Sequence, residues 1–212
     1  MIFKDRKEAG EKLAEKLRNY ANKKDTVVLG LPRGGVVVAF EAAQKLNLPL
    51  DILVPRKIGL PQDPEMAIGA IAEGFDGIFN NEIIKELNIS KEEIKNEVKK
   101  EKEEMARRLK LYRGEKPPLD LKGKTAIIVD DGIATGYTML ASIFSAKAKG
   151  AKKVIVAAPV IALDTIGKIK KESDELVYLD APEIFWSVGM FYEDFPQIED
   201  NEVMRLLKIA YK

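Results

Sequence analysis

Residues 126–138 read AIIVDDGIATGYT, a hydrophobic segment followed by two carboxylates and a turn rich in small and hydroxyl residues. The β-branched run predicts a buried strand, and the turn predicts the start of a helix. Backbone N–H groups at a helix start, together with the hydroxyls of Thr135 and Thr138, can surround a phosphate. Asp130 and Asp131 would then face the hydroxyls of a sugar. The segment therefore predicts a sugar-phosphate site; the weaker alternative is an ordinary strand-to-helix loop.

The rest of the chain repeats this change from strand to helix. Short apolar runs predict buried strands at residues 26–31, 52–54, 67–72, 125–129, 153–158 and 176–179. Helical patterns occur at residues 3–22, 35–46 and 138–149, and at residues 91–112 behind a capping box formed by Ser90 and Glu93. This alternation predicts an α/β fold with a doubly wound, mainly parallel sheet flanked by helices. In such sheets, ligands bind beyond the carboxyl ends of the strands.

Composition removes several classes of function. The 212 residues include no cysteine and no histidine, which excludes disulfides, thiolate zinc sites and catalytic groups that need an imidazole base. Any metal chemistry is then that of carboxylates and hard cations. With 35 Lys and Arg against 34 Asp and Glu, there is no charge excess to attract nucleic acid or an anionic membrane. The first residues carry no apolar export signal, so we expect a cytoplasmic protein.

Two further junctions carry residues suited to anions. Residues 30–35 read GLPRGG after the first predicted strand, and residues 54–59 read VPRKIG after the next. A P-loop is excluded at the first junction, because two valines follow where a P-loop has its lysine and its hydroxyl residue. Parallel strands bring both junctions to the sheet edge that carries the aspartates. The candidate pyrophosphate-binding residues there are Arg33, Gly34, Gly35, Arg56 and Lys57.

With these junctions the chain resembles the type I phosphoribosyltransferases, whose signature is a β-branched strand, two acidic residues and a Thr-Gly turn ending in Thr. It is similar to a group of predicted phosphoribosyltransferases of unassigned acceptor, which share its LPRGG, PRKIG, YRG and VDDG-ATG-T stretches. The resemblance implies the family fold with a small hood, a cis peptide within residues 31–34, and binding of 5-phosphoribosyl 1-diphosphate (PRPP). It also implies that the ribose 5-phosphate is bound by Ala134, Thr135, Gly136, Tyr137 and Thr138.

The family also carries a mobile loop that closes over PRPP. By resemblance, this loop contains Arg107, Arg108, Tyr112 and Arg113. The residues themselves leave an equal alternative, since arginine is favoured in the last turns of a helix.

Residues 181–195, APEIFWSVGMFYEDF, resemble the hood of the purine-salvage enzymes. In that hood, an aromatic side chain before a Val-Gly step stacks on the base, and a downstream acid assists Mg²⁺. The candidates for these roles are Phe185 or Trp186 for stacking, and Glu193 or Asp194 for the acid. One extra residue before Val188 leaves both choices open, and aromatic residues also commonly pack in cores. Ala134 stands where the hypoxanthine-type enzymes have an acid, which disfavours a 6-oxopurine acceptor.

These inferences combine into one prediction. Residues 1–212 form a single phosphoribosyltransferase domain, with a core at about 25–160 and a hood made of about 161–200 plus the N-terminal helix. Asp130 and Asp131 are expected to be catalytic and, with Glu193 and Asp194, to bind Mg²⁺. The expected partners are PRPP, a nitrogenous acceptor such as a nucleobase in nucleotide salvage, and a second copy in a homodimer, with no nucleic acid and no membrane. The alternatives are a regulator that senses PRPP or a nucleotide, and an inert scaffold.

Overall fold

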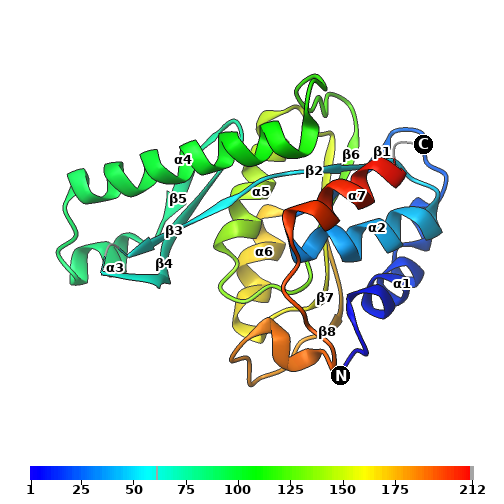
Figure 1. The fold of residues 1–212 in the computed structure, drawn as a ribbon. Helices are drawn as coiled ribbons and strands as arrows, with labels where there is room; N and C mark the ends of the chain where they lie inside the picture. The colour runs from blue at the N-terminus through cyan, green and yellow to red at the C-terminus, as the bar shows by residue number, and fades with distance from the viewer. Residues whose placement is uncertain (61, 211–212) are drawn as a thin grey trace.

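The computed structural model describes residues 1–60 and 62–210, which form two sheets (Figure 1). The larger sheet has five parallel strands in the order β2-β1-β6-β7-β8. Its strands are β1 (Thr26–Gly30), β2 (Leu50–Ile52), β6 (Thr125–Val129), β7 (Lys153–Val160) and β8 (Glu175–Asp180). The chain winds outward from β1 in one direction and from β6 in the other. The switch point between β1 and β6 is where open α/β sheets bind ligands.

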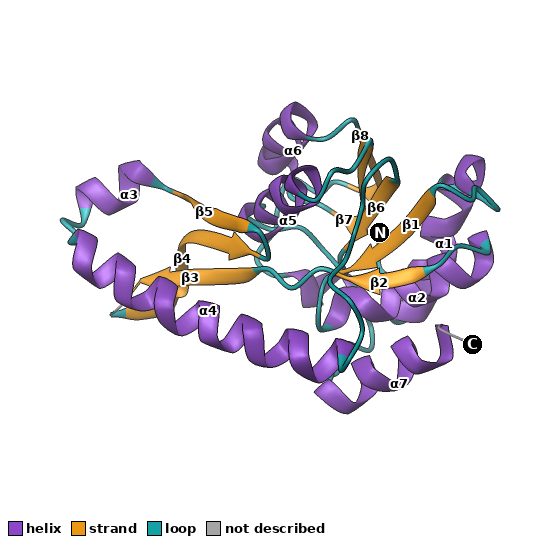
Figure 2. Cartoon of the chain, turned by 90° about the horizontal axis from the view of Figure 1, so that it is seen from above, coloured by secondary structure: helices purple, strands orange, loops and turns teal. Residues whose placement is uncertain are grey.

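Helices cover both faces of this sheet, as predicted (Figure 2). One face packs against α1 (Arg6–Lys16), α2 (Gly34–Leu46) and α7 (Asp200–Ala210), and the other against α5 (Tyr137–Ala148) and α6 (Ile166–Glu172). Along β1, Val28 joins the first apolar cluster, whereas Val27 and Leu29 join the second. The central strands β1, β6 and β7 are therefore apolar on both sides, which explains their uninterrupted apolar runs in the sequence.

A second, antiparallel sheet extends from one side of the main sheet (Figures 1 and 2). It contains β3 (Arg56–Leu60), β4 (Asp63–Ala72) and β5 (Phe75–Phe79), and it is followed by α3 (Asn81–Glu86) and α4 (Lys91–Arg113). We refer to these five elements as the arm. Ile58 and Ile68 form part of its core, against Ile94 and Val98 of α4. The predicted strand at residues 67–72 exists, but it belongs to this sheet and not to the parallel one.

The hood segment, residues 181–195, pairs with the N-terminus. The amide of Phe3 donates to the Phe191 carbonyl at 2.8 Å, and the amide of Glu193 donates to the Phe3 carbonyl at 2.8 Å. Short 3₁₀ helices lie at η1 (Arg18–Tyr20), η2 (Leu163–Thr165) and η3 (Val188–Phe191). None of the helices in the described residues is both long and apolar enough to cross a membrane.

Capping residues explain where the predicted helices begin and end. The Ser90–Glu93 capping box starts α4, and Gly114 follows its last residue, as predicted. The N-terminal helix is shorter than the predicted range of residues 3–22. Asp5 accepts a hydrogen bond from the Glu8 amide at its start, and Leu17 caps its end.

Candidate functional site

The loop between β6 and α5 has the form of an anion-binding turn. Gly136 adopts a left-handed conformation (φ 81°) and caps α5, which begins at Tyr137. Ala134 and Thr135 are exposed beside this helix start, where amides and the helix dipole favour an anion. The hydroxyl of buried Thr165 donates to the Ala134 carbonyl at 2.6 Å. The helix η2 therefore stabilises the loop between β6 and α5 by a hydrogen bond to its backbone.

Asp130 and Asp131 follow the last residue of β6. Arg6 Nε donates to Asp131 Oδ2 at 2.7 Å, and the Tyr192 hydroxyl donates to the Asp131 carbonyl oxygen at 2.6 Å. The Asp131 amide donates to Asp130 Oδ1 at 2.9 Å. Burial raises the pKa of the Asp130 carboxyl, and the neighbouring charge of Asp131 raises it further. Asp130 therefore binds a proton more readily than an exposed aspartate does.

The GLPRGG loop meets these aspartates, because β1 and β6 are paired along their length. The peptide that joins Pro32 to Arg33 is cis, which confirms the cis peptide expected within residues 31–34. Helix α2 begins at Gly34, which packs directly against the Asp131 carboxylate. The aspartates thus adjoin both the start of α2 and the loop that leads into α5.

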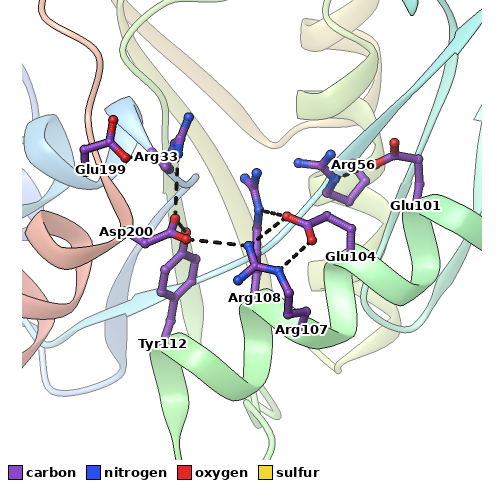
Figure 3. A network of polar contacts seen from close by, with 9 residues as sticks. All are labelled: Arg33, Arg56, Glu101, Glu104, Arg107, Arg108, Tyr112, Glu199 and Asp200. Atoms are coloured by element: carbon purple, nitrogen blue, oxygen red, sulfur yellow. Dashed lines mark hydrogen bonds and ion pairs between the residues drawn. The ribbon is translucent and has the colours of Figure 1, made fainter.

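Arg33 faces a group of polar side chains from α4 and from the start of α7 (Figure 3). Its Nη1 lies 3.8 Å from Asp200 Oδ1 and 3.9 Å from Glu199 Oε2. The Tyr112 hydroxyl donates to Asp200 Oδ1 at 2.5 Å, and Arg107 Nη2 lies 3.5 Å from Asp200 Oδ2. Asp200 therefore links the GLPRGG loop to the arm.

The residues predicted in a mobile loop lie in a helix instead, so that prediction is wrong and its helical alternative is correct. All four belong to α4, namely Arg107, Arg108, Tyr112 and Arg113. Arg113 is buried, donates to the Ile52 carbonyl at 2.7 Å, and lies 3.3 Å from both Asp51 and Glu73. It therefore joins α4 to β2. Arg107 and Arg108 each donate to Glu104 at 2.7 Å.

The VPRKIG junction also differs from its prediction. Arg56 and Lys57 are the first two residues of β3, not part of a loop. Arg56 Nε donates to Glu101 Oε2 of α4 at 2.6 Å (Figure 3). A pyrophosphate bound at Arg56 would therefore share this guanidinium with the Glu101 carboxylate or compete with it.

The two candidate stacking residues have different surroundings. Phe185 packs on Phe191 inside the hood, with ring centroids 5.0 Å apart. Trp186 is 85% exposed. Val188 packs against Gly132, directly after the aspartates, so the Val-Gly step lies beside the aspartate loop. Phe185 is a packing residue, whereas a planar ligand can reach Trp186.

The predicted set of four metal-binding carboxylates is not assembled. Glu193 and Asp194 are exposed, and their amides donate to carbonyls of the N-terminal segment. In the part of the chain that the structure describes, no three His, Cys, Asp or Glu side chains form a group that could hold a metal. Glu193 and Asp194 therefore do not extend the Asp130–Asp131 pair into a larger carboxylate site.

A cleft of about 380 Å³ opens between the GLPRGG loop and the segment after the hood. Arg6, Arg33 and Gly34 contribute to its lining, together with residues 195–198. The Phe195 ring contacts the Arg6 guanidinium, whose Cζ lies 3.6 Å from the ring centroid. The cleft thus has a cationic side and an aromatic side.

Sequence reasoning missed three residues that support this site, namely Arg6, Thr165 and Tyr192. Arg6 had a signal, because it continues the helical spacing of the buried residues Ala9 and Leu13. Thr165 and Tyr192 had none that we can identify. They contact residues 31 and 61 positions away in the chain, which local patterns do not indicate.

Comparisons with known proteins identify the family of this chain. The family model described as "Phosphoribosyl transferase domain" matches residues 2–193. A Mycobacterium tuberculosis protein named "Putative phosphoribosyl transferase" is 41% identical over 211 residues, which are 100% of this chain and 47% of that protein. This chain therefore spans about half the length of that relative. A "Ribose-phosphate pyrophosphokinase" of Pyrococcus furiosus is 45% identical over 60 residues, 27% of this chain and 22% of that protein.

Among solved structures, the crystal structure of TT1426 from Thermus thermophilus is similar over the whole fold. Its TM-score is 0.80 at 36% sequence identity, and the match covers 98% of each chain. The family model likewise extends over the main sheet, the arm and the hood segment. The chain therefore belongs to the phosphoribosyl transferase domain family.

Proposed function

We propose that the chain binds PRPP and transfers its 5-phosphoribosyl group to a nitrogenous acceptor, with release of pyrophosphate. The observation that carries this proposal is the meeting of three features at the switch point between β1 and β6. They are the turn before α5, the aspartate pair and the GLPRGG loop, which suit the phosphate, the ribose and the pyrophosphate of one substrate. The relative named for ribose phosphate supports a ligand of this class.

Each part of the substrate has residues of suitable chemistry. Residues 134–138 would bind the 5-phosphate through amides at the start of α5, and the aspartates would accept hydrogen bonds from the ribose hydroxyls. Arg33 would bind the pyrophosphate. Its distances of 3.8 and 3.9 Å to Asp200 and Glu199 are too long for hydrogen bonds. Arg33 would therefore lose little when it moves from these carboxylates to a phosphate.

The proposed reaction needs positioning and charge stabilisation more than it needs a nucleophile. Displacement at the anomeric carbon develops positive charge on the ribose and negative charge on the departing pyrophosphate. Asp130 and Asp131 would stabilise the first charge, and Arg33 would stabilise the second. This division of roles is compatible with a chain that contains neither cysteine nor histidine.

The aspartate pair also suits Mg²⁺. This ion prefers oxygen ligands, and it commonly binds through one or two carboxylates together with substrate phosphates and water. The described residues offer Asp130 and Asp131 but no group of three acidic side chains, which favours an ion that takes its other ligands from PRPP. When bound, Mg²⁺ would supply positive charge to the pyrophosphate oxygens.

We propose a nucleobase as the acceptor, which would make nucleotide salvage the role of the chain. Two features could hold a planar base. One is the exposed ring of Trp186 in the hood, and the other is the cleft lined by Arg33, Gly34 and residues 195–198. Rings and apolar walls with few polar groups are typical of small-molecule sites.

The test is pyrophosphate release from PRPP and Mg²⁺ with a panel of purine, pyrimidine and other nitrogenous acceptors. We expect release that depends on one acceptor, with the corresponding nucleoside 5′-monophosphate detected by chromatography. Calorimetry with PRPP alone separates the outcomes. PRPP binding without release for every acceptor would support the sensor alternative, and neither binding nor release would contradict both.

A further inference from the structure

Arg6 is a buried cation that contacts the aspartate pair. It is the first residue of α1, and its Nε donates to Asp131 Oδ2 at 2.7 Å. The Arg6 side chain is 8% exposed and the Asp131 side chain 14% exposed. Water therefore screens this ion pair weakly, and the geometry of the Asp131 carboxylate depends on Arg6.

The remaining contacts of Arg6 are with Phe195, the last residue of the hood segment, and with Pro196, which follows it. Its Nη1 donates to the Pro196 carbonyl at 2.8 Å, and its guanidinium lies over the Phe195 ring. Phe195 stacks on Tyr192 at 4.9 Å, and the Tyr192 hydroxyl donates to the carbonyl oxygen of Asp131. Asp131 is thus held at its side chain through Arg6 and at its backbone through Tyr192. Both contacts join Asp131 to the same stretch of chain, residues 192–196.

Packing alone does not explain a charge at this position. The buried face of α1 continues with Ala9 and Leu13, so an apolar residue at position 6 would extend that face. A buried ion pair requires the desolvation of both charges, and apolar replacements of such pairs are often neutral or stabilising. Lysine could neutralise Asp131, but its compact ammonium group lacks the planar, rigid fork with which a guanidinium reaches two separated acceptors and lies flat on a ring.

We propose that Arg6 is a positioning residue for phosphoribosyl transfer, which fixes the Asp131 carboxylate and couples it to Phe195 and Pro196. Arg6 acts through Asp131 and does not itself contact the reacting atoms. This proposal rests on the proposed function, because it assumes that Asp131 acts on the ribose of PRPP. Its consequence is that the effect of Arg6 on catalysis requires the Asp131 carboxylate.

A double-mutant cycle measures that requirement. Pyrophosphate release from PRPP and Mg²⁺ is compared for the wild type, Arg6→Met, Asp131→Asn and the double variant. Arg6→Met should lower kcat by about tenfold to a hundredfold, because misplaced catalytic groups have effects of that size. KM for PRPP should change much less. In the Asp131→Asn background, the further loss from Arg6→Met should be under about threefold.

Two variants separate positioning from folding. Arg18→Met is the matched control, because it removes an exposed arginine from the same N-terminal region and should keep wild-type activity. Arg6→Lys keeps the charge and should recover only part of the kcat lost in Arg6→Met, since a compact ammonium group lacks the planar fork that reaches both Asp131 and Pro196. Far-UV circular dichroism and thermal melting check each protein. If Arg6→Met does not fold, the cycle is run with Arg6→Lys, for which the loss of kcat should again disappear with Asp131→Asn.

The outcomes distinguish the two proposals. An inactive wild type with every acceptor contradicts the proposed function, and the positioning role with it. If the wild type is active but the losses of kcat from Arg6→Met and Asp131→Asn multiply in the double variant, Arg6 acts independently of Asp131. That result contradicts the positioning role but not the proposed function. Wild-type kcat in folded Arg6→Met would also overturn the positioning role. The positioning role is supported if Arg6→Met lowers kcat in the wild type but not in the Asp131→Asn background.

Discussion

Gly34 packs so closely against Asp131 that a Cβ atom on residue 34 would overlap the Asp131 carboxylate. Its neighbour shows the same relationship, since a Cβ on Gly35 would lie 2.7 Å from Asp130 Oδ1. The GLPRGG loop and the aspartate motif are far apart in the sequence, yet they pack against each other in the fold without room for a side chain between them. The two glycines are thus needed for close approach to the aspartates.

Gly34→Ala should reduce activity more than stability. The added methyl group would meet the Asp131 carboxylate and the Arg6 guanidinium, and so displace the carboxylate from its position. We expect kcat/KM for pyrophosphate release to fall at least about tenfold, which corresponds to roughly 1.4 kcal/mol of transition-state stabilisation. Gly167→Ala is the control, because a Cβ there meets no atom within 4 Å. Equal activity of the two variants would show that Gly34 is not required at the aspartates.

Thr165→Val should weaken the turn before α5. It keeps the shape of the buried side chain but removes the hydroxyl that donates to the Ala134 carbonyl at 2.6 Å. We expect a loss of about 1 kcal/mol in the free energy of unfolding, and weaker binding of ribose 5-phosphate in calorimetry. Thr165→Ser keeps the donor and should bind like the wild type. Similar affinities for the Val and Ser variants would argue that this hydrogen bond does not shape the turn.

The contact between Asp200 and Tyr112 should make stability depend on pH. The hydrogen bond from Tyr112 lowers the pKa of Asp200, and nearby arginines lower it further. Because folding lowers this pKa, the ionised carboxylate stabilises the fold above the pKa of the unfolded chain, about 3.9. That stabilisation is lost as the pH falls through the lower pKa of the folded state.

Urea unfolding of wild type and Asp200→Asn measures this effect. We expect the wild type to be more stable by about 1 kcal/mol at neutral pH, with the difference shrinking as the pH falls through the lowered pKa of Asp200 in the folded state. Glu199→Gln serves as the control, since Glu199 is exposed and should change stability little at either pH. A difference for Asp200→Asn that is independent of pH would contradict the assignment.

Two hood variants should behave differently. Phe185→Ala removes a ring that packs on Phe191, so it should lower the free energy of unfolding, by roughly 2 kcal/mol for a half-buried aromatic residue. Trp186→Ala alters an exposed ring and should leave stability nearly unchanged. If the base stacks on Trp186, this variant raises KM for the acceptor but not for PRPP. Unchanged acceptor KM would place the base elsewhere, with the cleft beside Arg33 as the next candidate.

The main sheet could be predicted because its strands are buried on both faces and appear as continuous apolar runs. Two strands of the arm, β3 and β5, could not be predicted in the same way. β3 begins with Arg56 and Lys57, and β5 contains Asp76 and Gly77, so neither has a clear apolar pattern. Their strand conformation depends on pairing with β4, which is a tertiary effect on the local preference.

The candidate site likewise contains some residues that the sequence predicts and others that it does not. The aspartates, the turn before α5 and the GLPRGG loop are short motifs, and the parallel sheet brings them together. The contact between Arg6 and Asp131 joins residues 125 positions apart, and only the folded chain brings them together. The choice between Phe185 and Trp186 likewise depends on which ring the hood buries.

The most direct test of phosphoribosyl transfer compares the wild type with Asp131→Asn in acceptor-dependent pyrophosphate release from PRPP and Mg²⁺. This substitution removes a charge from the proposed ribose site while it keeps the size of the side chain. We predict that kcat falls by at least about a hundredfold, while circular dichroism and thermal melting show a folded protein. Undiminished release by folded Asp131→Asn would contradict the role of the aspartate pair and, with it, this account of the site.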